Sequence, residues 1–167
     1  KKVVFKISIL PIVKVFSALF VHVFFVAFAL VICSVNGFTP NLYTLQIIYY
    51  TGCTFVFALA LVYATSAIVV FFRDLTQIIN IILQVGVWMT PIMWDLNMLS
   101  GHPMLMKAFK LNPMYYIVSG YRDSMLGQTG LTAHWKWGIY FWVVTIIIFA
   151  FGSVIFKRLK PHFADVL

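Results

Sequence analysis

Apolar residues fill this chain in blocks of membrane-spanning length, and short polar or turn-forming clusters separate the blocks. Residues 15–72 include no Asp, Glu, Lys or Arg, and this run of 58 residues is long enough to cross a bilayer twice. Two further blocks of 20 residues without such charges occupy 75–94 and 137–156. The pattern predicts an all-α integral membrane protein that uses lipid as its solvent.

Turn signals divide these blocks into four predicted spans. The cluster Asn36-Gly37-Phe38-Thr39-Pro40-Asn41 ends the first span. The second span is longer than a perpendicular crossing needs, so we expect a tilted helix. The predicted spans are 15–35, 43–72, 75–95 and 137–156.

The third predicted span contains a helix breaker. Pro91 has no backbone N–H, and it pushes the preceding residue, Thr90, away from helical geometry. We expect a kink or a break near the outer leaflet. Both a tolerated kink and a broken helix that belongs to a gate fit this pattern.

The distribution of Lys and Arg predicts the orientation, because positive residues concentrate on the cytoplasmic side of membrane proteins. With the N-terminus inside, eight positive residues are cytoplasmic and four are external. This favours a multi-pass plasma-membrane protein with both ends of the chain in the cytoplasm and 157–167 as a tail. The cytoplasmic set is Lys1, Lys2, Lys6, Lys14, Arg73, Lys157, Arg158 and Lys160, and the external set is Lys107, Lys110, Arg122 and Lys136.

The predicted external segment 96–127 is neither an ordinary polar loop nor a span. Asn112-Pro113 is a typical helix start and Gly127 a typical helix end. The first turns of that helix are apolar, whereas Arg122-Asp123 is too polar for lipid. The segment fits a helical hairpin that dips into the membrane from outside as a gate. Two helices lying flat at the interface fit equally well.

Residues 1–14 predict a short amphipathic helix on the cytoplasmic side, because apolar and positive residues fall on different helical faces before a break at Pro11. This helix either anchors the chain at the interface or docks onto a cytoplasmic partner. The residues assigned to docking are Lys2, Val4, Lys6 and Ile7.

The composition excludes several classes of protein. Hydrophobic residues make up 63% of the chain and charged residues 10%, which no soluble fold matches. The net charge of +8 comes from residues that flank apolar spans, so topology explains it better than nucleic-acid binding. Cys33 and Cys53 lie in apolar blocks without metal-ligand spacing, so we expect two buried thiols and no metal site.

Catalytic motifs are missing from the sequence. It contains no phosphate-binding loop, dinucleotide fingerprint or zinc motif. Glu is absent and no Asp interrupts a predicted span, which argues against an ion-coupled carrier. His22 lies in the middle of a span and fits either a packed, hydrogen-bonded residue or a proton relay. If the protein drives transport, its energy must therefore come from elsewhere.

A series of short motifs resembles the permease subunits of ABC-2 type polysaccharide exporters, over essentially the whole chain. Residues 115–124 look most like wall teichoic acid exporters, with O-antigen exporters as the close relatives. The motifs are Phe71-Phe72-Arg73-Asp74-Leu75, Ile82-Leu83-Gln84, Thr90-Pro91-Ile92, Leu111-Asn112-Pro113, Gly120-Tyr121-Arg122-Asp123 and Leu159-Lys160-Pro161-His162-Phe163-Ala164-Asp165-Val166-Leu167.

The resemblance implies a single ABC-2 transmembrane domain over 1–167 that holds the last four of six spans, so we expect the later part of a longer protein. It implies a homodimer bound to two copies of a separate ATP-binding subunit, which would hold ATP and Mg²⁺ and leave this chain without a cofactor. It also implies a coupling helix over 1–14, a coupling element at Arg73 and Asp74, and re-entrant gate helices within 96–127.

A lipid-linked polysaccharide has a polar glycan that cannot cross hydrocarbon, so its exporter needs a polar path with lateral access. Sugar rings stack on aromatic side chains through their apolar CH faces. Packing against lipid or other helices is the alternative role for each aromatic residue. The candidate path and gate residues are Trp88, Pro91, Trp94, Tyr115, Tyr116, Tyr121, Arg122 and Asp123.

Four other functions are alternatives to wall teichoic acid export. Two are close to it: export of O-antigen or capsular polysaccharide, and export of small hydrophobic molecules by an ABC-2 transporter. A membrane-embedded glycosyl or phosphoryl transferase would need acids or histidines clustered at one interface, and a passive channel would need a ring of polar residues on a span. The sequence shows neither pattern.

Overall fold

The computed structural model describes residues 9–72, 74–127 and 129–159. This part of the chain is built from helices, as predicted, and three short 3-10 helices lie at their junctions. The α-helices are α1 (Leu10–Val35), α2 (Gln46–Phe71), α3 (Leu75–Met89), α4 (Pro103–Lys110), α5 (Pro113–Leu126) and α6 (Trp135–Leu159), and the 3-10 helices are η2 (Leu42–Leu45), η3 (Leu96–Leu99) and η4 (Leu131–His134).

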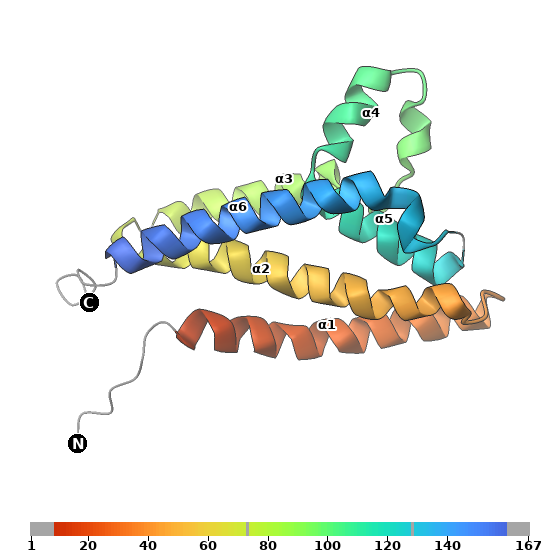
Figure 1. Cartoon of the computed structure of the whole chain (residues 1–167), viewed down its shortest axis with the longest axis horizontal. Coiled ribbons are helices and arrows are strands. Elements are labelled where there is room, and N and C mark those ends of the chain that lie inside the picture. Colours follow the sequence, from red (N-terminus) through yellow and green to blue (C-terminus); the bar gives the residue numbers. More distant parts are fainter. Residues whose placement is uncertain (1–8, 73, 128, 160–167) are drawn as a thin grey trace.

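The long helices run side by side along the longest axis of the molecule (Figure 1). The start of α1, the end of α2, the start of α3 and the end of α6 lie at one end, on the left of the picture. The turn between α1 and α2 and the end of α5 lie at the opposite end. The short helix α4 stands away from the long helices, beside the end of α3.

Three of these elements are long and apolar enough to cross a membrane: Leu10–Val35, Leu42–Phe71 and Leu131–Leu159. The third predicted span, 75–95, is shorter than expected, because α3 has 15 residues and ends at Met89. Such a helix is about 22 Å long, against about 30 Å of hydrocarbon. Thr90 is extended, with φ −93° and ψ 126°, as the residue before a proline must be. The break predicted here is therefore confirmed.

The first span begins earlier than the predicted residue 15. Helix α1 begins at Leu10 and holds Pro11 in its first turn, where a missing N–H breaks no helical hydrogen bond. Pro11 therefore starts a helix here rather than ending one, and Lys14 lies inside α1. Some predicted elements lie wholly or partly outside the described residues: Lys2, Val4, Lys6 and Ile7 of the coupling helix, Arg73, and 160–167 of the tail.

Helix α2 packs mainly against α6 and α5 and forms the centre of the fold. Gly152 of α6 lies so close to α2 that a Cβ there would stand 2.6 Å from the backbone nitrogen of Ala64. Small residues allow such close helix contact in lipid. The main buried cluster contains Tyr50, Cys53, Phe57, Tyr116, Ile117 and Phe141.

Helices α1 and α3 contribute little to this core. Only Pro11 and Val15 of α1 are buried, and no residue of α3 is. The surface of α1 carries a row of exposed aromatic rings, which suits lipid or another protein surface rather than water. The exposed phenylalanines of α1 are Phe16, Phe20, Phe24, Phe25 and Phe28.

The bounds of α5 match the sequence prediction. The Asn112 side chain accepts a hydrogen bond from the Met114 N–H at 3.0 Å, and Pro113 occupies the first helical position. Gly127 ends the helix in the left-handed conformation, with φ 65°. Local capping chemistry therefore sets both ends of this helix.

Candidate functional site

Helix α5 contacts α1, α2, α4 and α6, and its polar residues form side-chain hydrogen bonds to several neighbouring elements. Successive residues of a helix point about 100° apart, so Tyr121, Arg122 and Asp123 reach three different neighbours. Tyr121 faces α1 and α2, Arg122 faces the turn after α3, and Asp123 faces the segment before α6. We treat α5 and the turn at 90–94 as the candidate gate site.

Arg122 binds the backbone where α3 is broken. One terminal guanidinium nitrogen lies 2.8 Å from the carbonyl oxygen of Pro91, 3.1 Å from that of Ile92 and 3.4 Å from that of Trp94. These carbonyl groups follow the end of a helix and have no helical partner. An arginine that donates hydrogen bonds to these carbonyl groups stabilises the turn. The hydrogen bonds also offset the desolvation cost of burying the guanidinium and the carbonyl groups.

Asn112 joins the start of α5 to the same break. Its amide nitrogen donates to the Thr90 hydroxyl at 2.9 Å, while its amide oxygen caps α5. The Thr90 hydroxyl in turn donates to the Gly86 carbonyl at 2.8 Å. The broken end of α3 is thus tied to α5 through side chains at two separate points.

Tyr121 links α5 to α1 and α2. Its hydroxyl lies 2.8 Å from Nε2 of His22 and 2.8 Å from Oγ1 of Thr51. Thr51 has one hydroxyl hydrogen, which it donates to the Ile47 carbonyl at 2.8 Å. Tyr121 must therefore donate to Thr51, and His22 must donate to Tyr121 from a protonated Nε2. The geometry fits the packed, hydrogen-bonded role for His22.

Asp123 binds the segment that leads into α6. The Thr129 hydroxyl donates to its Oδ2 at 2.7 Å, and Nε2 of His134 lies 3.0 Å from the same oxygen. An ionised carboxylate only accepts hydrogen bonds, so Nε2 of His134 carries the proton. Arg122 and Asp123, too polar for lipid, both find partners inside the protein, but these are separate partners and not each other.

The two tyrosines at the start of α5 have different surroundings. Tyr116 is buried in the core, where its ring centroid lies 5.5 Å from that of Tyr50 and 5.4 Å from that of Phe141. Tyr115 is half-buried, and burial raises the pKa of its phenol above the ordinary value of 10.0.

Comparison with known proteins now identifies the family. The family model of the ABC-2 type transporter matches residues 3–126, from the start of the chain to the end of α5. The chain belongs to the ABC-2 type transporter family. It is a membrane subunit of a transporter, as predicted, and not an enzyme. The resemblance inferred from short motifs is thereby confirmed.

One curated relative of this permease is the O-antigen export system permease protein RfbA of Klebsiella pneumoniae. The two sequences are 26% identical over 170 residues, which covers 100% of this chain and 63% of the relative. The chain therefore spans less than two thirds of the relative's length.

The remaining predicted residues of the permease lie at the break or far from it. Pro91 is buried at the break, and Trp88, on the last turn of α3, is 74% exposed. The Trp94 indole nitrogen donates to the Trp88 carbonyl at 3.3 Å, and the Trp94 ring packs edge-on against Phe109 of α4. Asp74 is exposed at the opposite end of α3, so it belongs to a separate site.

Sequence reasoning missed several polar partners of α5. Thr51, Thr129 and His134 carry no motif, and their roles depend on residues that are distant in the sequence. A usable signal existed for Thr51, because a hydroxyl inside an apolar span needs a hydrogen-bond partner. The sequence could not name that partner.

Proposed function

We propose that this chain is the permease subunit of an ATP-driven exporter of a lipid-linked polysaccharide, and that it works as a homodimer with two copies of a separate ATP-binding subunit. Membership of the ABC-2 family supports the permease role. The likeness to an O-antigen export permease supports a polysaccharide as cargo. ATP and Mg²⁺ would bind to the partner, which agrees with the lack of a phosphate-binding loop in this sequence.

The contact between Arg122 and the broken end of α3 is the observation that carries the mechanism. Helix α5 packs into the core through Tyr116 and Ile117, so it forms a fixed support. The segment 90–111 has few buried residues and is held to α5 and α6 largely by hydrogen bonds. Hydrogen bonds can exchange without exposing a core, so 90–111 is the movable part of the gate.

The aromatic residues at the break and beside it suit a glycan. Trp88 and Trp94 lie at the break, and sugar rings can stack on their faces when the segment moves. Tyr115 is the candidate on α5. Tyr116 supports the helix from the core instead, and Tyr121, Arg122 and Asp123 position the gate through their hydrogen bonds.

The proposed topology has both ends of this chain in the cytoplasm. Helices α1, α2 and α6 each cross the membrane. Helix α3 forms most of the fourth crossing, and because it is shorter than the hydrocarbon layer, residues from the segment 90–111 complete that crossing. Asp74, together with Arg73, would lie in the cytoplasmic turn between α2 and α3, where an ATP-binding subunit can reach it. Coupling through 1–14 remains a prediction that replacing Val4 and Ile7 with Asp would test.

Substitution of Arg122 tests the gate. Arg122→Gln removes the positive donor from three carbonyl groups, and we expect export to fall by about tenfold, the effect of losing one hydrogen bond to a charged group. Arg122→Lys keeps the charge without the planar fork and should give an intermediate rate. The assay is glycan export by the full permease with its ATP-binding subunit in vesicles.

Arg158→Gln is the matched control, because Arg158 is exposed at the end of α6. Copurification of the ATP-binding subunit should be unchanged in all three variants. Full export by Arg122→Gln would contradict the gate.

Depletion of the permease tests the cargo. An exporter leaves its lipid-linked glycan on the cytoplasmic side when it is removed, so mass spectrometry of the accumulated lipids identifies the cargo. A polyol-phosphate chain would indicate wall teichoic acid, our first choice, and a repeating sugar unit would indicate O-antigen or capsule. Accumulation of no glycan, with loss of drug export, would indicate small hydrophobic molecules instead. A transferase would change the glycan structure rather than its location.

A further inference from the structure

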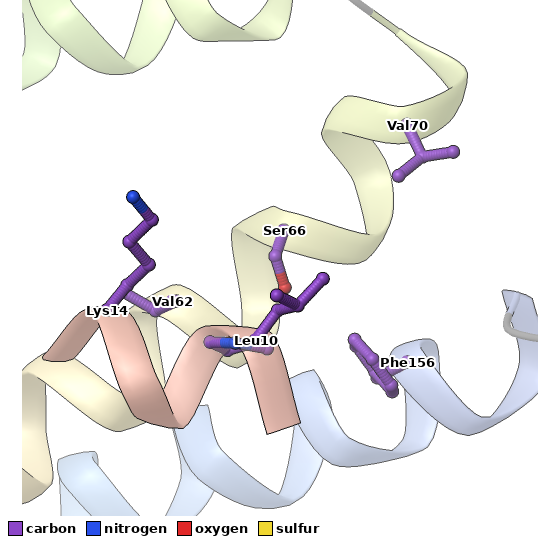
Figure 2. Close-up of a pocket in the computed structure, with 7 residues that line it drawn as sticks. Leu10, Lys14, Val62, Ser66, Val70 and Phe156 are labelled. Atoms are coloured by element: carbon purple, nitrogen blue, oxygen red, sulfur yellow. The ribbon is translucent and has the colours of Figure 1, made fainter. Parts of the chain in front are cut away.

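A cavity lies at the end of the bundle where α1 begins, far from the gate. It has a volume of about 270 Å³, near the lower limit of about 300 Å³ for small-molecule pockets. Figure 2 shows it between α1, α2 and α6. Most of its lining is apolar, and the residues are Leu10, Pro11, Lys14, Val62, Ser66, Val70 and Phe156.

The Ser66 hydroxyl is the first sign of a ligand. Its oxygen is buried and has no hydrogen-bond partner among the described residues. In Figure 2 this hydroxyl points from α2 towards Leu10, on the opposite wall of the cavity. A buried polar group without a partner destabilises a protein, and native proteins pair the great majority of such groups with protein atoms or ordered water, so an unpaired one calls for an explanation. A ligand with an acceptor oxygen would satisfy Ser66.

Lys14 is the second sign. Its side chain is exposed and extends away from α1 in Figure 2, and among the described residues no carboxylate lies within ion-pair distance of it. The first turn of α1 contains no acidic residue, and the positive end of the helix dipole lies there. This side of the cavity therefore favours an anionic group.

Both polar groups lie just inside the edge of the hydrocarbon layer, next to the headgroup region, if the helices are centred in the bilayer. Lys14 is about 13 Å along the axis from the middle of α1, and Ser66 is about 11 Å from the middle of α2. The hydrocarbon layer ends about 15 Å from its centre. A lysine at this depth extends its ammonium towards the phosphates, while a hydroxyl slightly deeper lies near the ester groups.

We propose that this cavity binds one anionic glycerophospholipid from the surrounding leaflet. Part of an acyl chain would fill the apolar cavity, an ester carbonyl would accept a hydrogen bond from Ser66, and the phosphate would bind Lys14. A free anion would leave the apolar lining uncovered, and a hydrocarbon chain alone would leave Ser66 unpaired. A glycerophospholipid carries an acyl chain, an ester carbonyl and a phosphate, in that order from the membrane centre outwards, which matches the apolar lining, Ser66 and Lys14.

Lipid binding to the purified, delipidated complex of full-length permease and ATP-binding subunit tests this assignment. Phosphatidylglycerol and phosphatidylcholine with identical acyl chains are titrated, and binding is measured by native mass spectrometry. We expect phosphatidylglycerol to bind about tenfold more tightly, and Lys14→Gln to remove this preference, because one hydrogen bond to a charged group is lost. Lys136→Gln, beside Trp135 at the other end of α6, is the matched control and should keep the preference.

Ser66→Ala separates binding from folding. Because the hydroxyl is unpaired without lipid, we expect the melting temperature of the lipid-free protein to stay the same or rise, while phosphatidylglycerol affinity falls by about fivefold. Ser17→Ala, whose hydroxyl bonds to its own helix, is the control and should leave lipid affinity unchanged.

Three results would overturn the assignment. They are equal affinity of the unaltered protein for both phospholipids, an unchanged preference in Lys14→Gln, and retention of a glycan-linked lipid in place of a glycerophospholipid.

Discussion

His22 shows how a single polar residue is accommodated in an apolar helix. It lies at the middle of α1, where an unpaired imidazole would be costly in lipid. The Tyr121 hydroxyl, itself bonded to Thr51, supplies the partner. Among the described residues no carboxylate hydrogen-bonds to His22. A proton relay through His22 would therefore lack a neighbouring acid to exchange the proton with.

A double-mutant cycle measures the bond between His22 and Tyr121. His22→Phe and Tyr121→Phe each remove one partner, and we expect a coupling energy of about 0.6–1.7 kcal/mol, the range for hydrogen bonds between helices in membranes. The free energy of unfolding in detergent is the measurement. His22→Gln keeps an N–H donor and should recover part of the loss. A coupling energy near zero would mean that the bond does not stabilise the fold.

At the scale of elements, Asn112 performs two tasks with one side chain. Its amide oxygen caps α5 and its amide nitrogen binds Thr90. The Thr90 hydrogen is already donated to Gly86, so Thr90 can only accept from Asn112. An aspartate at this position would keep the cap and lose the link, because a carboxylate has no donor.

The pair Asn112→Ala and Asn112→Asp separates these two tasks. We expect Asn112→Ala to destabilise the start of α5 by about 1 kcal/mol, the usual cost of a lost cap. Asn112→Asp should keep the cap, with help from the helix dipole. Hydrogen exchange at the Met114 amide is the measurement, and it should accelerate in Asn112→Ala only.

Asn97→Ala, at an exposed position of η3, is the control and should leave exchange at Met114 unchanged. Equal protection in Asn112→Ala and the unaltered protein would show that the cap contributes nothing.

At the scale of the whole molecule, the turns between the long helices lie at two opposite ends of the bundle, and we expect these two ends to lie at opposite membrane faces. The turn between α1 and α2 lies opposite the turn between α2 and α3 (Figure 1). The exposed phenylalanines of α1 and the unburied α3 leave large apolar surfaces uncovered, which suit lipid or, in the homodimer that we propose, a second copy of the chain. Orientation in the membrane then follows from the positive residues.

Cysteine labelling tests this topology in a background without Cys33 and Cys53. Asn41→Cys and Lys107→Cys should react with a charged thiol reagent added outside the cell, because both positions are exposed and predicted to be external. Asp74→Cys should react only after the membrane is opened, and it serves as the matched position on the other face. Labelling of Asp74→Cys from outside would reverse the orientation.

The sequence by itself determined the properties that depend on local chemistry. Hydrophobic blocks predicted the three long helices, because lipid requires every backbone group to bond within its own helix. Asn112-Pro113 and Gly127 predicted both ends of α5, because caps act within one turn. Pro91 predicted the break in α3, although not that the helix would be too short to span.

Only the tertiary structure decided which residues meet. His22 and Tyr121 are 99 residues apart, and Arg122 is 31 residues from Pro91, so no local pattern could pair them. The packing of α2 against its neighbours likewise decides that Tyr116 is buried. It also leaves the buried Ser66 hydroxyl without a hydrogen-bond partner among the described residues. Periodicity and capping are properties of one helix, whereas hydrogen bonds between helices depend on packing that the whole chain determines.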